Sequence, residues 1–147
     1  MHERIEPPTY LLLAVVLAAG LHFLAPAVRV VPRPWNLLGL LPLTIGLAAN
    51  FWASTLFRRA GTTIKPDERP ARLITGGPYR CTPHPMYVGM MLVLLGVVVL
   101  LGSLMPFVAL VPFGWVMRGF MKMEERQMGE AFGEAYRDYA GRTRRRP

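Results

Sequence analysis

The residues best suited to chemistry lie in a proline-punctuated polar segment, residues 76–89, that leads into a long apolar run. It contains Tyr79, His84 and Tyr87, and a proline stands on either side of His84. Proline disfavours helix at the residue before it and is favoured at the first position of a helix. We therefore expect His84 at the amino end of a helix, a place that suits an anionic ligand. From local features alone, an interfacial loop histidine without a function is the alternative.

A pair of carboxylates, Glu124 and Glu125, follows the last apolar run of the chain. With Lys122 and Arg126 beside them, they also fit an ordinary solvated helix start. At helical spacing, however, position 124 shares a face with Met128, so at least one carboxylate points toward the apolar side. A charge in such a place is costly unless it has a partner. A cationic ligand would supply that partner.

The composition indicates an integral membrane protein. Of the 147 residues, 52% are hydrophobic, and the charged residues are crowded into a few windows. The single cysteine, Cys81, excludes an internal disulfide, and together with His84 it provides too few ligands for a zinc site. We therefore expect no metal in this protein.

Long runs almost free of charge predict an all-α membrane protein with about four transmembrane helices. The predicted spans are residues 10–28, 35–57, 86–101 and 104–120, and the last two form a tight hairpin. The alternative for the first run is a cleaved signal peptide. A long polar connection, residues 58–84, separates the second and third spans. After the fourth span, apolar residues at helical spacing predict an amphipathic surface helix over 121–140.

The distribution of basic residues predicts the orientation in the membrane. Four spans place 15 of the 17 Lys and Arg residues on one side, together with both termini. The positive-inside rule makes that side cytoplasmic, in an inner or plasma membrane. These residues orient the helices and attract anionic lipid headgroups, so nucleic acid is not expected as a partner. The oligomeric state stays open.

Two polar residues lie inside the first two predicted spans. His22 either lines a tunnel for a lipophilic molecule or, as we favour, stays neutral and bonds to another helix. Asn50 is expected to join two helices by hydrogen bonding.

Several motifs in a fixed order carry a family resemblance. They are Gly-Pro-Tyr-Arg at 77–80, His-Pro-Met-Tyr-Val-Gly at 84–89, Glu-Glu at 124–125 and Phe-Gly-Glu-Ala-Tyr-Arg-Asp-Tyr at 132–139. Over residues 73–140 the chain resembles the isoprenylcysteine carboxyl methyltransferase and phospholipid methyltransferase family of membrane enzymes. No single motif is decisive, but the ordered set is specific.

The resemblance implies that residues 1–147 form one membrane methyltransferase domain that uses S-adenosylmethionine. The cofactor site would lie on the cytoplasmic side, covered by residues 58–84 and by the C-terminal helix. The acceptor would be lipophilic: an isoprenylcysteine-like carboxylate, a phospholipid amine or another small lipid-like molecule. The residues that match the family's cofactor contacts are Leu73, Ile74, Tyr79, His84, Pro85, Met86, Tyr87, Glu124 and Glu125.

The chain departs from the family pattern at two positions. Pro83 stands where the family often has Arg, and Phe120 stands where the carboxyl methyltransferases share an Arg thought to hold the substrate. Arg118 and Lys122 are therefore the candidates for positioning the acceptor, and no catalytic residue is assigned. An alternative from another class is a non-enzymatic small membrane protein, such as a transporter-like or scaffold subunit. That protein would have no affinity for the cofactor.

Overall fold

The computed structural model describes residues 5–25, 28–61 and 73–145. Over these residues the chain is mostly helical and forms no strand, as the predicted all-α class requires. The α-helices are α1 (Pro7–Leu24), α2 (Leu40–Ala60), α3 (Pro85–Leu101), α4 (Leu110–Phe132) and α5 (Glu134–Arg145). Three short 3₁₀ helices join them: η1 (Trp35–Gly39), η2 (Gly77–Arg80) and η3 (Met105–Ala109).

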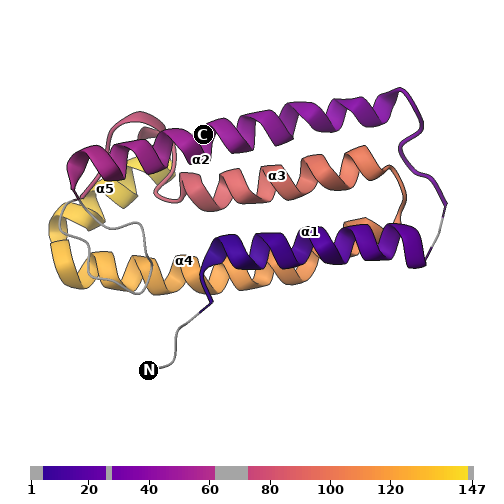
Figure 1. Ribbon diagram of the computed structural model, residues 1–147. Helices are drawn as coiled ribbons and strands as arrows, with labels where there is room; N and C mark the ends of the chain where they lie inside the picture. The colour runs from indigo at the N-terminus through magenta and orange to yellow at the C-terminus, as the bar shows by residue number, and fades with distance from the viewer. Residues whose placement is uncertain (1–4, 26–27, 62–72, 146–147) are drawn as a thin grey trace.

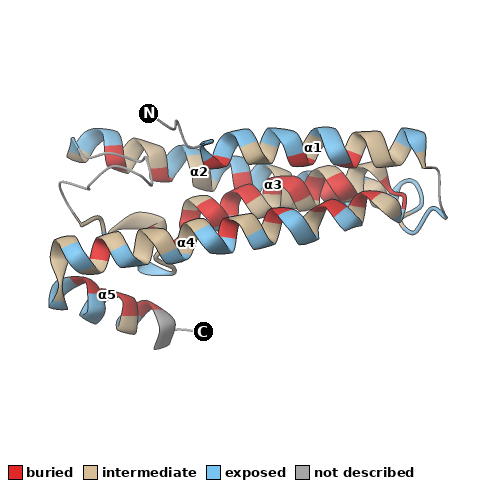
Figure 2. Ribbon diagram, turned by 90° about the horizontal axis from the view of Figure 1, so that it is seen from below, coloured by how far each residue is buried: buried red, intermediate tan, exposed pale blue. Residues whose placement is uncertain are grey.

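The first four α-helices lie side by side in an elongated bundle, and α5 folds back at one end of it (Figure 1). α3 is the central helix, with eight of its 17 residues buried, whereas α1 and α4 are exposed along much of their length (Figure 2). The end of the bundle that carries α5 also holds η2 and the start of α3. Segments far apart in the sequence, from Gly77 in η2 to Tyr139 in α5, therefore lie at the same end of the bundle.

Two helical segments, Pro7–Leu24 and Trp35–Ala60, are long and apolar enough to cross a membrane by length and composition. α3 is apolar but shorter. Large apolar side chains on α1 and α2 face outward, such as Leu12, which is 63% exposed, and Phe51, which is 71% exposed. A surface of this kind suits contact with lipid tails. The full set of four spans and the cytoplasmic orientation stay predictions.

The C-terminal region differs from the expected separate helix over 121–140. α4 continues through the expected boundary at residue 120 to Phe132, because nothing in the sequence between them breaks a helix. The break comes at Gly133, which has a φ of 55°. That conformation is cheap only for glycine. α5 then begins at Glu134 and runs back along the end of the bundle.

The predicted polar connection, residues 58–84, is described only in part. α2 continues to Ala60 and ends at Gly61, which adopts the left-handed conformation typical of a helix C-terminus. Residues 62–72 lie outside the described part of the chain. The connection's last section contains η2, followed by the turn that leads to His84.

Two polar residues of the apolar segments differ in their bonding. His22 forms a hydrogen bond, whereas the buried Oδ1 of Asn50 has no hydrogen-bond partner among the described residues, so the interhelical bond expected of this atom is not found. At the end of the bundle away from α5, His22 Nδ1 lies 2.7 Å from Ser103 Oγ, in the turn after α3. His22 therefore bonds to a neighbouring element, as we favoured, and does not lie near α5. The amide of Asn50 packs against Gly89, since a Cβ at position 89 would be 2.8 Å from its Nδ2. Asn50 thus lies in the contact between α2 and α3.

Glycines allow the backbones of α2 and α3 to come into direct contact. A Cβ on Gly96 of α3 would lie 2.5 Å from the carbonyl oxygen of Gly39 and 2.7 Å from the amide nitrogen of Leu43. Such a close crossing stabilises helix pairs in lipid, where van der Waals packing replaces the hydrophobic effect.

We expect Gly96→Ala to lower stability, because its methyl group must push two backbones apart at a cost of about 1–3 kcal/mol. Thermal unfolding in detergent measures the effect. Gly20→Ala is the matched control, because a Cβ on Gly20 of α1 meets no atom within 4 Å among the described residues. Equal unfolding temperatures for the two variants would contradict the close crossing.

Candidate functional site

A histidine and two carboxylates from distant parts of the chain meet at the end of the bundle that carries α5. His84 is the N-cap residue of α3, and Pro85 begins that helix as the sequence predicts. The backbone N–H of His84 donates to Thr82 Oγ1 at 3.2 Å, which fixes the turn before the helix. Glu124 and Glu125 come from the second half of α4.

The imidazole of His84 lies between the two carboxylates. Its Nε2 is 2.9 Å from Glu125 Oε1, a hydrogen-bond distance. Its Nδ1 is 3.8 Å from Glu124 Oε2, which is an ion-pair distance but too long for a hydrogen bond. Among the described residues, Nδ1 is buried without a hydrogen-bond partner. One nitrogen of the ring is therefore satisfied, and the other faces a carboxylate that it does not reach.

Burial and the carboxylates act on the pKa of His84 in opposite directions. Burial disfavours the charged ring and lowers the pKa, whereas Glu124 and Glu125 stabilise the charged ring and raise it. The carboxylates outweigh burial, so the pKa of His84 lies above its ordinary value. The two carboxylates thus favour the protonated form of the ring.

Two tyrosines complete the polar wall around Glu124. The ring of Tyr87 lies edge-on to that of His84, with their centroids 5.8 Å apart, and its hydroxyl interacts with the Glu124 carboxylate. Tyr79 of η2 is buried, and its ring packs 5.6 Å from that of Phe57. Burial raises the pKa of Tyr79 above its ordinary value, and the charge of Glu124 adds to the effect. Tyr79 therefore keeps its proton and acts as a hydrogen-bonding group.

A buried tyrosine hydroxyl joins α5 to this site. Tyr139 donates to the backbone carbonyl oxygen of Tyr79 at 2.6 Å. Burial raises the pKa of Tyr139, as do Tyr136 and Glu124, so the hydroxyl keeps its proton. This bond joins the C-terminal helix to η2 across 60 residues of sequence.

An apolar floor supports the polar groups. It is a cluster of buried side chains from α2, η2, α4 and α5, against which Leu73, Ile74 and Met86 pack. Met86 also packs against the larger core between α1, α3 and α4, so it links the site to the bundle. The structure thus places all nine of the expected cofactor contacts at one end of the bundle, with Leu73 and Ile74 in the floor.

The two candidates for holding the acceptor lie elsewhere on α4. Arg118 and Lys122 are exposed, and at 3.6 residues per turn they point about 120° and 160° away from Glu124 around the helix axis. Neither reaches the carboxylate cluster across that helix. Position 120, where the carboxyl methyltransferases carry Arg, is Phe120 and lies on the Glu124 side of the helix.

Sequence reasoning did not identify Tyr139 as a site residue. The helical spacing of Phe132, Tyr136 and Tyr139 predicts an apolar face, and this face gives Tyr139 a packing role only. The available signal was its hydroxyl, because a tyrosine that is buried usually finds a hydrogen-bond partner. The partner is a backbone carbonyl, which no sequence pattern identifies.

The raised pKa of His84 predicts a stability that falls with rising pH. The protonated ring is stabilised in the folded protein, so its contribution is complete below the unfolded pKa of about 6.5. The contribution is lost as pH rises through the higher folded pKa. As the pH rises from the unfolded pKa of His84 to its folded pKa, the unfolding temperature of the wild type should fall. We expect this fall to be larger than that of His84→Gln over the same pH range. Parallel pH profiles of the two proteins would contradict the assignment.

We also expect Tyr139→Phe to destabilise the protein by about 1–2 kcal/mol, because the carbonyl oxygen of Tyr79 loses a buried hydrogen bond. Denaturation followed by circular dichroism measures the change. Proteolysis within α5 should also become faster, since the helix loses its tie to η2. An unchanged rate of cleavage would show that packing alone holds α5.

Comparison with known proteins connects this geometry to a family. A family model for phospholipid methyltransferases matches residues 35–135, which include η2, His84 and both carboxylates. Searches of the curated proteins and of the solved structures found no significant match. The matched region covers more than half of the chain and contains the histidine, the carboxylate pair and the apolar helices that carry them. The chain therefore belongs to the phospholipid methyltransferase family of membrane proteins.

Proposed function

We propose that the protein transfers a methyl group from S-adenosylmethionine to a lipophilic acceptor at the cytoplasmic face of a membrane. Membership of the phospholipid methyltransferase family supports methyl transfer in general. The observation that carries the proposal is the position of His84, buried between Glu124 and Glu125 at one end of an apolar helical bundle. Such a charged cluster is costly at a membrane surface and suits a charged ligand.

The cluster fits the charge of the proposed cofactor. The cluster combines two acidic side chains with a histidine, and S-adenosylmethionine carries an ammonium, a carboxylate and a sulfonium, so each kind of charge on the cofactor has a suitable group in the cluster. Glu124 or Glu125 would hold the ammonium or a ribose hydroxyl. The unpartnered Nδ1 of His84 and the first N–H groups of α3 would meet the carboxylate. Tyr79 and Tyr87 offer aromatic faces for the adenine or the sulfonium.

The residues of the site do not need to activate the methyl group. S-adenosylmethionine, when bound, would supply a methyl group that the sulfonium has already activated. The residues of the site therefore need to align the acceptor and to exclude water. Leu73, Ile74 and Met86 in the apolar floor keep water from beneath the polar groups. The bond from Tyr139 to η2 holds one wall in place.

The charges near the cluster favour an amine acceptor over a carboxylate. The carboxylate that does not hold the cofactor would attract an ammonium headgroup and repel a second anion. It would also take up the proton that this nitrogen must lose before its lone pair can attack the methyl group. A carboxylate acceptor needs a basic residue beside the site, but Arg118 and Lys122 are exposed and point away from Glu124. Phe120 occupies the position of the family's substrate-holding Arg. A lipid amine, as on a phospholipid headgroup, is therefore the acceptor class we propose.

The second hypothesis is a membrane protein without enzymatic activity, such as a scaffold or a transporter-like subunit. It gives the buried charges of His84 and the two carboxylates a purely structural role. It predicts no saturable binding of S-adenosylmethionine, and this separates the two proposals.

Calorimetric titration of the detergent-purified protein with S-adenosylmethionine tests the function. We expect saturable binding by the wild type and a loss of at least about tenfold, or ~1.4 kcal/mol, in Glu124→Gln and His84→Gln. Glu130→Gln is the matched control, because Glu130 is exposed on the same helix. Its affinity should equal that of the wild type.

A folded wild type that does not bind the cofactor would refute the proposal. Equal losses in Glu124→Gln and in the Glu130→Gln control would refute the assigned site. For the acceptor, transfer of a radiolabelled methyl group to phosphatidylethanolamine in vesicles is expected. Methyl transfer only to the carboxylate of a prenylated cysteine would overturn the preference for an amine acceptor.

A further inference from the structure

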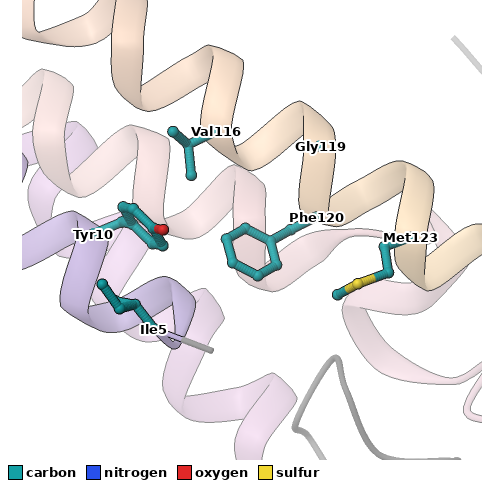
Figure 3. A pocket seen from close by; sticks show the side chains of 6 residues that line it. All are labelled: Ile5, Tyr10, Val116, Gly119, Phe120 and Met123. Atoms are coloured by element: carbon teal, nitrogen blue, oxygen red, sulfur yellow. The ribbon is translucent and has the colours of Figure 1, made fainter. Parts of the chain in front are cut away.

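A groove of about 300 Å³ lies between the start of α1 and the second half of α4. Six residues line it: Ile5, Tyr10, Val116, Gly119, Phe120 and Met123. The side chains of Val116, Phe120 and Met123 extend from α4 toward Tyr10 and Ile5 (Figure 3). The rings of Tyr10 and Phe120 meet edge to face, with their centroids 5.7 Å apart. The groove is separate from the apolar floor beneath the carboxylates.

The lining of the groove suits a hydrocarbon. Its side chains carry no charge, and the Tyr10 hydroxyl is the one oxygen among them. Leu13 and Leu17 lie on the same face of α1 as Tyr10, three and seven residues further along the helix. Their side chains are 54% and 45% exposed. An apolar strip therefore leads from the groove along the outer surface of the bundle, where lipid tails would lie.

The groove lies close to the charged cluster along α4. Phe120 is one helical turn before Glu124, and Met123 is its immediate neighbour on α4. Side chains one turn apart lie about 5–6 Å from each other. A molecule with its tail in the groove can therefore place its headgroup beside the carboxylates.

The size of the groove limits what it holds. At about 300 Å³, the groove stands at the lower end of the roughly 300–1,000 Å³ range of ligand pockets. That is enough for one tail of an amphiphile and too little for two tails side by side. The remainder of a longer tail would continue along the strip on α1.

Gly119 is the position that keeps the groove open. It is exposed, and a Cβ built there meets nothing within 4 Å among the described residues. A larger side chain would therefore extend into open space without a backbone clash. The lack of a side chain at this position leaves the volume of the groove free.

We infer that the groove between α1 and α4 binds a single hydrocarbon tail of the methyl acceptor, and that Gly119 determines the size of tail it admits. This inference rests on the proposed function, because it places the acceptor's headgroup at the carboxylates. It goes further in naming a single-tailed amphiphilic amine, or one tail of a two-tailed lipid, as the bound group.

Photolabelling of the full chain tests the inference without any methyl transfer. The probe is dodecylamine with a diazirine at its terminal carbon, and labelled peptides are mapped by mass spectrometry. We expect saturable labelling of the segments 5–10 and 116–123, with competition by unlabelled dodecylamine. Gly119→Leu should lower this labelling by at least about tenfold, because leucine fills the groove. Gly119→Ala, which adds one methyl group, should lower it much less.

Gly129→Leu is the matched control. Gly129 lies on the same helix with equally open space around it, on the opposite side from Phe120. Both leucine substitutions raise the helix propensity of α4, so neither is expected to impair folding. Labelling of Gly129→Leu should equal that of the wild type, and all variants should bind S-adenosylmethionine alike.

Three outcomes decide the inference. Labelling spread evenly over the exposed faces of α1 and α2, or unchanged in Gly119→Leu, would overturn it while leaving the cofactor proposal intact. Localised labelling in a protein that does not bind S-adenosylmethionine would support the groove as a tail site and refute the methyltransferase proposal. Localised labelling together with cofactor binding supports both.

Discussion

The structure depends on keeping two adjacent carboxylates at the end of an apolar bundle. An unpaired carboxylate in such a place is costly, so Glu124 and Glu125 require a positive partner. His84 is that partner, and it is in position because Pro85 starts α3 directly after it. The start of one helix and the second half of another are thus fixed relative to each other by charge. The tyrosines and the apolar floor are arranged around this pairing.

Much of this arrangement follows from local sequence rules. The apolar runs predicted α1, α2 and α3 to within a few residues, and the prolines around His84 predicted the start of α3. The helical face of Glu124 predicted a carboxylate in need of a partner, although a ligand was expected in that role. Within the protein, His84 already fills part of it. These features were accessible because each depends on neighbours in sequence or on the cost of burying a charge.

Features that depend on three-dimensional contact were not accessible. The close crossing of α2 and α3 rests on Gly39 facing Gly96, and no rule of spacing pairs residues so far apart. The bond from Tyr139 to a carbonyl of η2 is equally long-range. The uninterrupted course of α4 to Phe132 was missed for another reason. A change from apolar to mixed composition indicates where a helix leaves the membrane, but it does not end the helix.

The bond between Tyr139 and η2 has a consequence for the order in which the protein is made. The residues of the charged cluster precede α5 in the chain, so α5 emerges from the ribosome after the other described helices. The helices of the bundle can enter the membrane and pack before α5 exists. One wall of the site is fixed only when α5 docks on η2. A chain interrupted before Gly133 would thus form the bundle without the helix that fixes this wall of the site.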